Sequence, residues 1–335
     1  MIVNLPYKIL IEKDVGSKLA DFFESLGAKS VAIVCNDNVL RVAGSRIKGI
    51  KNARTVKAES MEKTYLESLA KRIDADIIVG MGGGRSIDIA KYVAYLSGKQ
   101  WVAFPTILSH DGVVSSRASL ENNGMKISVE AKEPIAIIAD LDIIKSAPYR
   151  WIASGAGDVL SNMSAVEDWK IASKAGKEEY HTVMAELSLL GVRSVVENIE
   201  DIRKMSHHGL EMLLWGLICS GFAMNIYGSS RPCSGSEHNF SHALEKLGSK
   251  ALHGEQCALG TLIMMRLQGK NPNEVRSHMK KLGLPTTAKD IGIEKNILVK
   301  ALVMAKEIRN RYTVLDKKRI NAKIAERLLK ETKII

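Results

Sequence analysis

The sequence is poor in cysteine, and its cysteines are never paired. The four of them lie far apart and form no C-x-x-C motif: Cys35, Cys219, Cys233 and Cys257. This spacing argues against both a zinc ribbon and a disulfide framework. The N-terminus also lacks the basic stretch and apolar core of a signal peptide. We therefore expect a protein of the reducing cytoplasm.

Long apolar runs and aromatic-rich basic segments are missing as well. The longest apolar run, Met212 to Tyr227, is shorter than the roughly 20 residues that cross a bilayer and contains Asn225. We interpret it as a buried helix and expect no transmembrane segment. The net charge is +11, but basic stretches such as Lys317-Lys318-Arg319 lack the interleaved aromatics that single-strand binding uses. The charge therefore favours an anionic small substrate over nucleic acid.

The spacing of apolar residues changes midway along the chain. With 335 residues, two domains of roughly 150 residues each are expected. In the first third, short β-branched runs alternate with helix-like segments, which is typical of parallel strands joined by crossover helices. The predicted strands are Ser30 to Val34, Asp76 to Val79 and Trp101 to Phe104.

From about Trp151 onward the strand pattern ends and helical spacing takes over, for example over His181 to Met205 and Asn296 to Arg309. Pro148 lies near the change. We predict an α/β domain with a parallel sheet at 1–150 and an all-helical domain at 151–335. An active site between them would be reached from the carboxyl edge of the sheet.

A glycine-rich turn follows the second predicted strand. Gly82, Gly83 and Gly84 would let the backbone approach a pyrophosphate, and the next helix offers its N-terminal N–H groups. The turn departs from G-x-G-x-x-G because Arg85 follows it, so a tight turn without a ligand is the alternative. After the first strand, Asn36-Asp37 is placed to bond the adenosine ribose.

A histidine pair marks a second candidate site. A helix is predicted from Ser234 to Gly248, with Ser234 and Glu237 as a capping box and Gly248 as its stop. His238 and His242 lie four apart, on the face opposite its apolar residues. Two such histidines are often simply solvated.

A third histidine and a carboxylate strengthen the prediction of a metal site. His253 follows shortly after the pair and can fold back beside it. Upstream, Asp158 opens a helical pattern with Asn162 one turn later. A carboxylate with two imidazoles and an open position is a catalytic rather than a structural ligand set.

These features resemble one known superfamily. The glycine turn, Asp158, the histidine pair and His253 occur in the order found in the dehydroquinate synthase-like and iron-containing alcohol dehydrogenases. Three strings resemble archaeal-type sn-glycerol-1-phosphate dehydrogenases: Gly82-Gly-Gly-Arg-Ser-Ile-Asp88, Ser229-Ser-Arg-Pro-Cys-Ser-Gly-Ser-Glu-His238 and Leu252-His-Gly-Glu-Gln-Cys257. The resemblance covers nearly the whole chain. It implies a Rossmann-like first domain and a helical metal- and substrate-binding second domain.

The resemblance also implies a chemistry. One zinc ion per subunit would be held by Asp158, His238 and His253, with His242 near the substrate. Iron-dependent relatives have a histidine where this chain has Asn162, a poorer ligand, which favours zinc. NADH or NADPH would reduce dihydroxyacetone phosphate to sn-glycerol 1-phosphate, used for ether phospholipids. Zinc would polarise the ketone, and water or His242 would deliver the proton. Relatives are homo-oligomers.

Further roles follow by resemblance. The string Pro105-Thr-Ile-Leu-Ser-His-Asp-Gly-Val-Val-Ser115 resembles the family's loop over the nicotinamide. The resemblance implies that Asp111 contacts the substrate hydroxyls and that Asp111 and His242 are catalytic. The alternative is a loop that ends a strand and is capped by serine and aspartate. Besides Asn36 and Asp37, the expected cofactor contacts are Gly82, Gly83, Gly84, Ser86, Asp88, Thr106, Ser109 and Ser115. Asp158 and His242 would also contact substrate.

The substrate phosphate needs a cation. Arg231 is the first choice because a guanidinium binds phosphate oxygens in a bidentate fork, and Arg309 and Arg311 come second. Any of them can instead form a surface ion pair.

Rival functions stay open at this point. A glycerol dehydrogenase acting on unphosphorylated polyols is the nearest. Dehydroquinate synthase is weaker, because we see no dense lysine and arginine set near the histidine helix. A metal- or nucleotide-binding module without turnover is a third.

Overall fold

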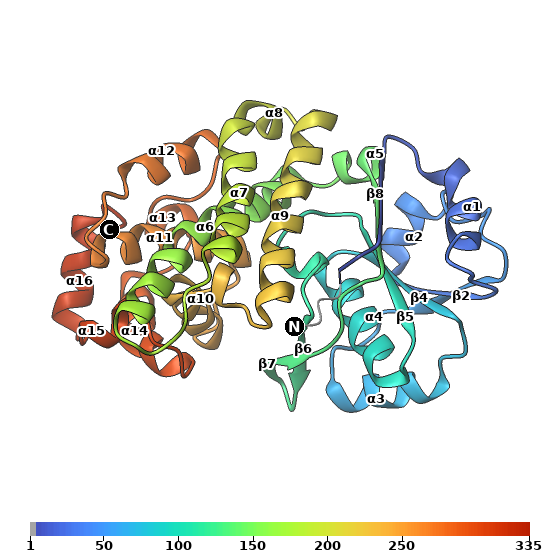
Figure 1. Cartoon of the computed structure of the whole chain (residues 1–335). Helices are drawn as coiled ribbons and strands as arrows, with labels where there is room; N and C mark the ends of the chain where they lie inside the picture. The colour runs from blue at the N-terminus through green and yellow to red at the C-terminus, as the bar shows by residue number, and fades with distance from the viewer. Residues whose placement is uncertain (1–4) are drawn as a thin grey trace. The chain divides into compact units, whose positions relative to one another are not determined.

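The computed structural model describes residues 5–335. The chain divides into two compact units, one ending at Pro148 and one beginning at Tyr149. The first unit is an α/β unit with a parallel sheet and the second is helical (Figure 1). The predicted fold class is therefore confirmed.

The first unit is built around a six-stranded sheet in the order β1-β8-β5-β4-β2-β3, with every pairing parallel. The strands are β1 (Lys8–Glu12), β2 (Val31–Cys35), β3 (Ala53–Lys57), β4 (Ile77–Gly82), β5 (Gln100–Pro105) and β8 (Ala136–Asp140). Strands β2, β4 and β5 match the predicted ones. Because β2 and β4 are neighbours, their carboxyl ends meet at one edge of the sheet.

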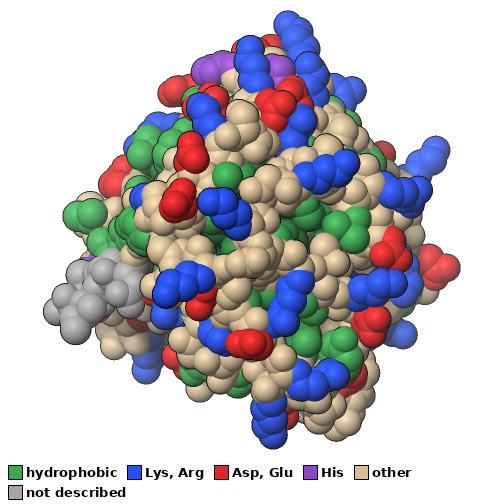
Figure 2. Space-filling view, turned by 90° about the vertical axis from the view of Figure 1, so that its right-hand side faces the viewer, with side chains coloured by type: hydrophobic (Ala, Val, Ile, Leu, Met, Phe, Trp, Pro, Cys, Tyr) green, Lys and Arg blue, Asp and Glu red, His purple; other side chains and the backbone are tan. Residues whose placement is uncertain are grey.

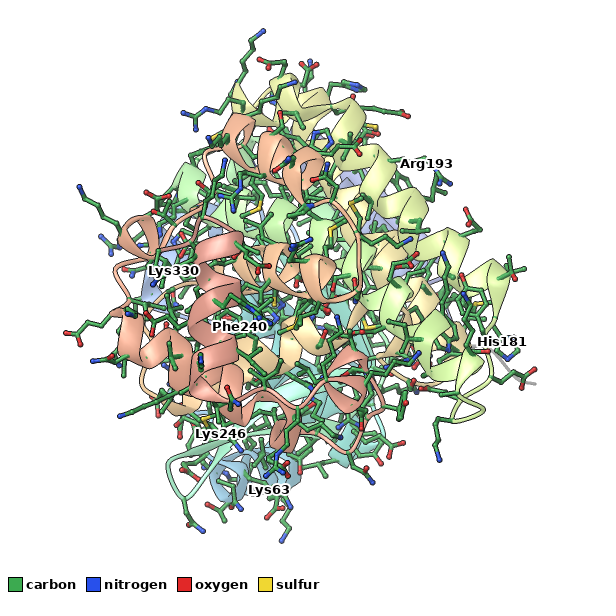
Figure 3. The ribbon with its side chains drawn as sticks, turned by 90° about the vertical axis from the view of Figure 1, so that its left-hand side faces the viewer. Lys63, His181, Arg193, Phe240, Lys246 and Lys330 are labelled. Carbon is green, nitrogen blue, oxygen red and sulfur yellow. The ribbon has the colours of Figure 1, made fainter. Side chains whose placement is uncertain are left out.

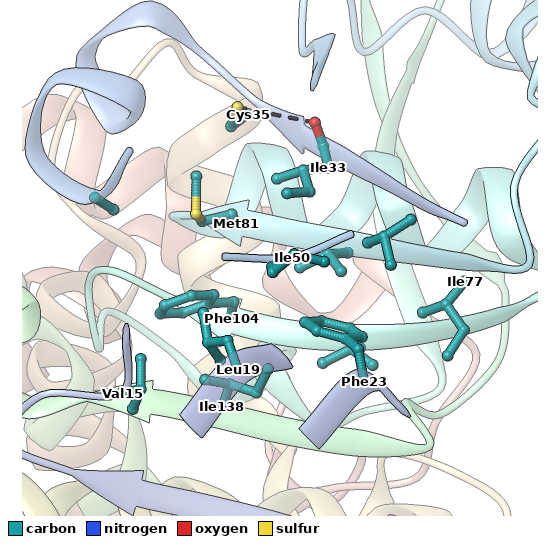
Figure 4. Packing of buried hydrophobic residues seen from close by; sticks show 14 of the residues in the cluster. Val15, Leu19, Phe23, Ile33, Cys35, Ile50, Ile77, Met81, Phe104 and Ile138 are labelled. Carbon is teal, nitrogen blue, oxygen red and sulfur yellow. Dashed lines mark hydrogen bonds between the residues drawn. The ribbon is translucent and has the colours of Figure 1, made fainter. Parts of the chain in front are cut away.

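Alternate residues of the strands face opposite sides of this sheet. One set, with Ile33, Met81 and Phe104 among its members, packs against Leu19 and Phe23 of α1 and forms the core in Figure 4. On the other face, Gly80 lies against the backbone of α4. The sheet is thus covered on both faces, as parallel sheets require. The helices of this unit are η1 (Gly16–Lys18), α1 (Leu19–Glu24), α2 (Asp37–Ala43), α3 (Lys63–Arg72), α4 (Gly84–Ser97), η2 (Asp111–Val113) and α5 (Leu141–Lys145).

A hairpin interrupts the alternation of strands and helices. Strands β6 (Arg117–Asn122) and β7 (Met125–Glu130) pair antiparallel, apart from the main sheet. The turn between them contains Asn123 and Gly124, both at positive φ. This Asn-Gly pair is typical of a tight hairpin turn.

The second unit contains only helices within its described residues, which run from 149 to 335. They are α6 (Tyr149–Lys174), α7 (Thr182–Glu197), α8 (Ile199–Arg203), α9 (His207–Tyr227), η3 (Arg231–Cys233), α10 (Ser236–Lys246), α11 (His253–Leu267), α12 (Asn273–Lys281), α13 (Ala288–Ile291), α14 (Lys295–Met304), η4 (Ala305–Ile308), α15 (Val314–Lys317) and α16 (Ala322–Glu331). The predicted helix at His181 to Met205 is divided into α7 and α8.

Helix α9 contains the longest apolar run. The helix is long and apolar enough to cross a membrane, but 61% of its most apolar 18-residue stretch is buried within the structure. Gly191 of α7 and Gly216 of α9 let these helices meet closely, since a Cβ at Gly191 would lie 2.6 Å from the Gly216 carbonyl oxygen. Helix α9 is therefore a core helix of the second unit.

Basic side chains are scattered over the one face that Figure 2 shows. On this face, lysines and arginines stand among aspartates and glutamates, without one continuous basic band.

Candidate metal centre and cofactor turn

Three helices of the second unit converge through glycines. A Cβ at Gly157 of α6 would lie 2.6 Å from the carbonyl oxygen of Gly254, the second residue of α11. A Cβ at Gly260 would meet Phe240 of α10 at 3.1 Å, and Figure 3 shows Phe240 among these helices. Because only glycine fits at such contacts, the residues next to them are brought into one place.

Those neighbours carry the predicted metal ligands. Asp158 Oδ1 lies 3.6 Å from His238 Nε2 and 3.6 Å from His253 Nε2. Asp158 and His238 are buried, and His253 is partly exposed. The structure therefore brings together the three side chains that the resemblance indicated. It adds Cys257, whose sulfur completes a group of four donors all within 4.8 Å of one another.

Outer partners orient both imidazoles. His238 Nδ1 lies 2.8 Å from Glu237 Oε1, and His253 Nδ1 lies 3.3 Å from Ser241 Oγ. Each Nε2 thus faces Asp158, while each Nδ1 contacts an oxygen of a neighbouring side chain. This arrangement fixes the orientation of metal-binding histidines. Burial opposes a positive charge on His253, yet Cys257 and Asp158 raise its pKa to about 9. A pocket that favours positive charge with nitrogen, oxygen and sulfur donors fits a bound zinc ion.

Asn162 does not join this group. Its amide nitrogen donates to Ser220 Oγ at 2.8 Å, within the packing of α6 against α9. The residue is buried and acts as a hydrogen-bonding core residue.

His242 lies beside the donors and is held by two charged residues. Its Nε2 lies 2.6 Å from Arg309 Nη2, and its Nδ1 lies 3.1 Å from Glu245 Oε2. Because a guanidinium only donates, Nε2 accepts and Nδ1 carries the proton. Burial lowers the pKa of His242 to about 4, and Arg309 and His253 act in the same direction. His242 is therefore neutral near pH 7, which makes it a hydrogen-bond acceptor for Arg309 rather than a proton donor.

The first choice for the phosphate cation is corrected by the structure. Arg231 is fully buried, donates to the carbonyl oxygens of Asp168 and Tyr312, and pairs with Glu178 at 3.0 Å. Such a guanidinium ties helices together and has no surface for a ligand. Arg309 is the better candidate because it is half-buried and lies against His242.

Arginines are also denser here than the sequence indicated. Arg311 donates to the Ser234 carbonyl and to Ser230 Oγ, while Arg309 donates to Ser234 Oγ at 2.8 Å. Burial, followed by Arg309 and Arg231, lowers the pKa of Arg311 to about 10. Three arginines thus surround the segment before the histidine helix. The expectation of no dense basic set there is wrong, because two of them come from a distant part of the chain.

The start of that helix is corrected too. Helix α10 begins at Ser236 with Gly235 as N-cap and no side-chain cap. Ser234 instead accepts from Arg309, and Glu237 accepts from the Gly235 N–H at 2.6 Å. The Glu237 carboxylate thus contacts both the N-cap residue of α10 and the imidazole of His238. The predicted stop is close, since α10 ends at Lys246 and Gly248 has φ +85°.

In the first unit, the glycine turn lies between β4 and α4 as predicted. Gly82 has φ +146°, and a Cβ there would lie 2.7 Å from Ser86 Oγ. Gly83 is the N-cap of α4 and supplies no side-chain cap. The Thr106 N–H donates to the Gly82 carbonyl at 3.0 Å, joining the turn to the loop after β5. A helix N-terminus without a side-chain cap, next to glycines, leaves its main-chain N–H groups suited to binding a pyrophosphate.

Two expected cofactor contacts have internal partners. Asp88 is buried in α4; its Oδ1 accepts from Lys91 Nζ at 3.1 Å and its Oδ2 from the Ser119 N–H. Asn36 caps α2 by accepting from the Val39 N–H. Both carboxylate oxygens of Asp88 are engaged, so we correct its role to support of the fold. The exposed Asp37 lies 3.7 Å from Lys57 and faces solvent at the end of β2.

The loop after β5 is folded against the turn. Thr106, Ser109 and Ser115 are buried, and Asp111 begins η2. His110 accepts a hydrogen bond from the Gly112 N–H and packs on the turn, since a Cβ at Gly84 would lie 2.4 Å from its Nε2.

Comparisons with known proteins agree with these features. An iron-containing alcohol dehydrogenase family model matches residues 10–148. The chain is 41% identical to the glycerol-1-phosphate dehydrogenase [NAD(P)+] of Hyperthermus butylicus, over 99% of both chains. It is 39% identical to that of Methanosarcina barkeri, over 99% of this chain and 96% of the relative. A probable glycerol dehydrogenase from Sinorhizobium meliloti shares the fold, with a TM-score of 0.80 at 20% identity over 99% and 97% of the two chains. The chain belongs to the glycerol-1-phosphate dehydrogenase family.

Proposed function

We propose that this protein is an NAD(P)H-dependent sn-glycerol-1-phosphate dehydrogenase that reduces dihydroxyacetone phosphate. The observation that carries the proposal is the cluster of Asp158, His238 and His253 in a chain that matches glycerol-1-phosphate dehydrogenases over nearly its whole length. The neighbours named glycerol dehydrogenase are only about one-fifth identical and support the fold alone.

A metal ion is part of the proposal. Asp158, His238 and His253 would hold one zinc ion per subunit. When bound, zinc acts as a Lewis acid that polarises a carbonyl oxygen. Asp158 contributes the negative charge that offsets the ion, and Glu237 and Ser241 hold the imidazoles in orientation.

The reaction needs a hydride and a proton. When bound, the reduced nicotinamide would supply a hydride to C2 of the substrate, and the oxygen on C2 would take up one proton. Gly82, Gly83 and the start of α4 would bind the cofactor pyrophosphate, with Thr106 and Ser109 nearer the nicotinamide and Asp111 at the substrate hydroxyls. Because His242 is neutral and accepts from Arg309, we assign the proton to water and assign His242 to orienting Arg309.

Arg309 is proposed to bind the substrate phosphate. It is positioned by Ser234 and His242, two residues that flank the ligand His238. A guanidinium matches phosphate oxygens in a fork of two hydrogen bonds. The net charge of +11 would also attract the anion.

The function is tested by NADH and NADPH oxidation with dihydroxyacetone phosphate after zinc is added, with a stereospecific enzyme identifying the product. Formation of sn-glycerol 1-phosphate, lost in His253→Ala, is expected. Turnover of unphosphorylated dihydroxyacetone alone would leave the metal site intact and refute the phosphate substrate.

Arg309→Gln tests the phosphate subsite. Loss of a charge-assisted hydrogen bond costs about 1.5–3 kcal/mol, so kcat/KM for dihydroxyacetone phosphate should fall about 10–100-fold. Residual turnover of dihydroxyacetone should change little. Arg266→Gln, which removes an exposed ion pair with Glu331, is the control and should behave as wild type. Equal losses on both substrates would show that Arg309 does not act through the phosphate.

We further propose that the protein acts in the cytoplasm as a homo-oligomer and supplies the glycerol phosphate of ether phospholipids. Size-exclusion chromatography with light scattering measures the assembly directly. A monomer with full activity would contradict only the proposed homo-oligomer.

A further inference from the structure

A buried carboxylate outside the candidate metal site connects two segments of the second unit. Asp168 lies on α6 and is fully buried. Its Oδ2 accepts from the N–H of Ser236 at 2.7 Å and from the Ser236 hydroxyl at 2.5 Å, and its Oδ1 accepts from the Val314 N–H at 2.8 Å. One side chain of α6 therefore holds the first residue of α10 and the first residue of α15.

The chain between η4 and α15 carries the proposed phosphate-binding residue. Residues 309–313, which we call the arginine strap, form neither a helix nor a strand. Arg309 donates to Ser234 Oγ at 2.8 Å, and Arg311 donates to the Ser234 carbonyl at 2.5 Å. Because the strap lacks the hydrogen-bond pattern of a helix or a strand, the place of Arg309 depends on such contacts and on the anchor at Val314, where the strap ends.

The donors around Asp168 require a carboxylate. Two of them are main-chain N–H groups, one at each oxygen, so the NH₂ group of an asparagine would face an N–H whichever way the amide is turned. A buried charge is costly unless it is hydrogen-bonded and paired. Here Arg231 adds a positive charge, and its guanidinium donates to the carbonyl oxygens of Asp168 at 2.8 Å and of Tyr312, within the strap, at 2.9 Å. Gly235 leaves room for the carboxylate, since a Cβ there would lie 2.7 Å from Asp168 Oδ2.

We propose that Asp168 is a positioning residue that holds the arginine strap against α10 and thereby places Arg309 to bind the substrate phosphate. The inference rests on the proposed phosphate subsite and adds the group that fixes its cation. Arg309 meets α10 at His242, one turn after His238. A shift of the strap would therefore change the distance between the guanidinium and the candidate metal site. A misplacement of about 1 Å by a remote substitution can cost about 100-fold in rate.

Asp168→Asn tests the proposal in the zinc-loaded enzyme. We expect kcat/KM for dihydroxyacetone phosphate to fall about 10–100-fold. Residual turnover of dihydroxyacetone, which has no phosphate, should change little, as should zinc content and NADH affinity. In an Arg309→Gln background the same substitution should lower kcat/KM by no more than about 3-fold further, because two residues that act through one contact are not additive.

Asp290→Asn is the control. It removes a carboxylate of the same unit that also accepts from two main-chain N–H groups, those of Thr286 and Thr287, and it should keep wild-type kinetics on both substrates.

The outcomes separate this inference from the proposed function. Equal losses on both substrates in Asp168→Asn, or the full loss again in the Arg309→Gln background, overturn the positioning role and leave the phosphate subsite standing. If Arg309→Gln alone has no effect, the phosphate subsite and this inference fail together. If Asp168→Asn does not fold, Ser236→Ala decides, because it removes one of the three donors. A smaller loss confined to dihydroxyacetone phosphate is then expected, and unchanged kinetics or equal losses on both substrates would refute the proposal.

Discussion

The two candidate binding regions are built in different ways. In the first unit the glycine turn offers main-chain groups, with Gly82 at φ +146° and no side-chain cap on α4. In the second unit the candidate metal site consists of side chains such as Asp158 and His238, buried on helices that meet through glycines. A main-chain site depends on backbone conformation, while a side-chain site depends on the identity of each donor. Substitutions should therefore damage them differently.

Replacing a donor should have the largest effect. Asp158→Asn keeps the shape of the side chain but removes the negative charge shared by His238 and His253. Loss of outer partners of a metal ligand alone costs about 10–100-fold, so loss of the carboxylate should reduce kcat/KM by more than about 100-fold. Zinc content by atomic absorption should fall with it.

The matched control is Asp21→Asn, which removes an exposed carboxylate from the first turn of α1. This variant should keep both zinc and activity. Full zinc content together with full activity in Asp158→Asn would contradict the assignment of the metal site.

Changing the backbone of the turn should have the next largest effect. Gly82→Ala forces a Cβ to within 2.7 Å of Ser86 Oγ at a φ that L-residues rarely adopt. The turn must shift to relieve strain of about 1–3 kcal/mol, which would displace the main-chain groups that are proposed to bind the pyrophosphate. NADH binding should therefore weaken about 10–100-fold, measured by nicotinamide fluorescence, while zinc content stays unchanged.

Gly98→Ala provides the control within the same helix. Gly98 ends α4 at φ +67°, and a Cβ there meets nothing within 4 Å. This variant should lower thermal stability and leave NADH affinity unchanged. If both variants weakened NADH equally, the turn would have no specific role in binding the cofactor.

Much of the fold was predictable because it depends on local patterns. The apolar runs of β2, β4 and β5 are buried central strands and were identified. Edge strand β3 is ARTVK and mostly exposed, so its sequence carries no apolar run. Strand β8, although buried, is only AIIAD and is hard to distinguish from a helical segment by periodicity.

The side chains of the candidate metal site could be proposed from the sequence, and most of their neighbours could not. His238 and His253 stand in recognisable strings, whereas Arg309 is distant in sequence and reaches His242 only in the folded chain. The role of Arg231 depends on burial, which its sequence context does not reveal. Cys257 did carry a signal, since it lies four residues after His253, a helical spacing that places both on one face.

The smallest effect on NADH binding is expected for a substitution of Asp88, a buried side chain that supports the main-chain site of the first unit. Its carboxylate holds the buried Lys91, whose ammonium also donates to the carbonyl oxygens of Gly112 and Arg117. The pair thereby fastens the loop after β5 to α4. Asp88→Asn should destabilise the first unit, because removing one partner of a buried ion pair costs about 3–5 kcal/mol. NADH affinity should fall less than in Gly82→Ala.

Urea unfolding measures this loss of stability, and Glu67→Gln is the control. Glu67 pairs with Lys63 at 3.8 Å on the exposed face of α3, and such a surface pair contributes at most about 0.5 kcal/mol. If Asp88→Asn instead kept full stability and lost NADH binding as severely as Gly82→Ala, the Asp88 carboxylate would contact the cofactor itself. The first unit would then use a side-chain donor as the second unit does, and the contrast between the two sites would not hold.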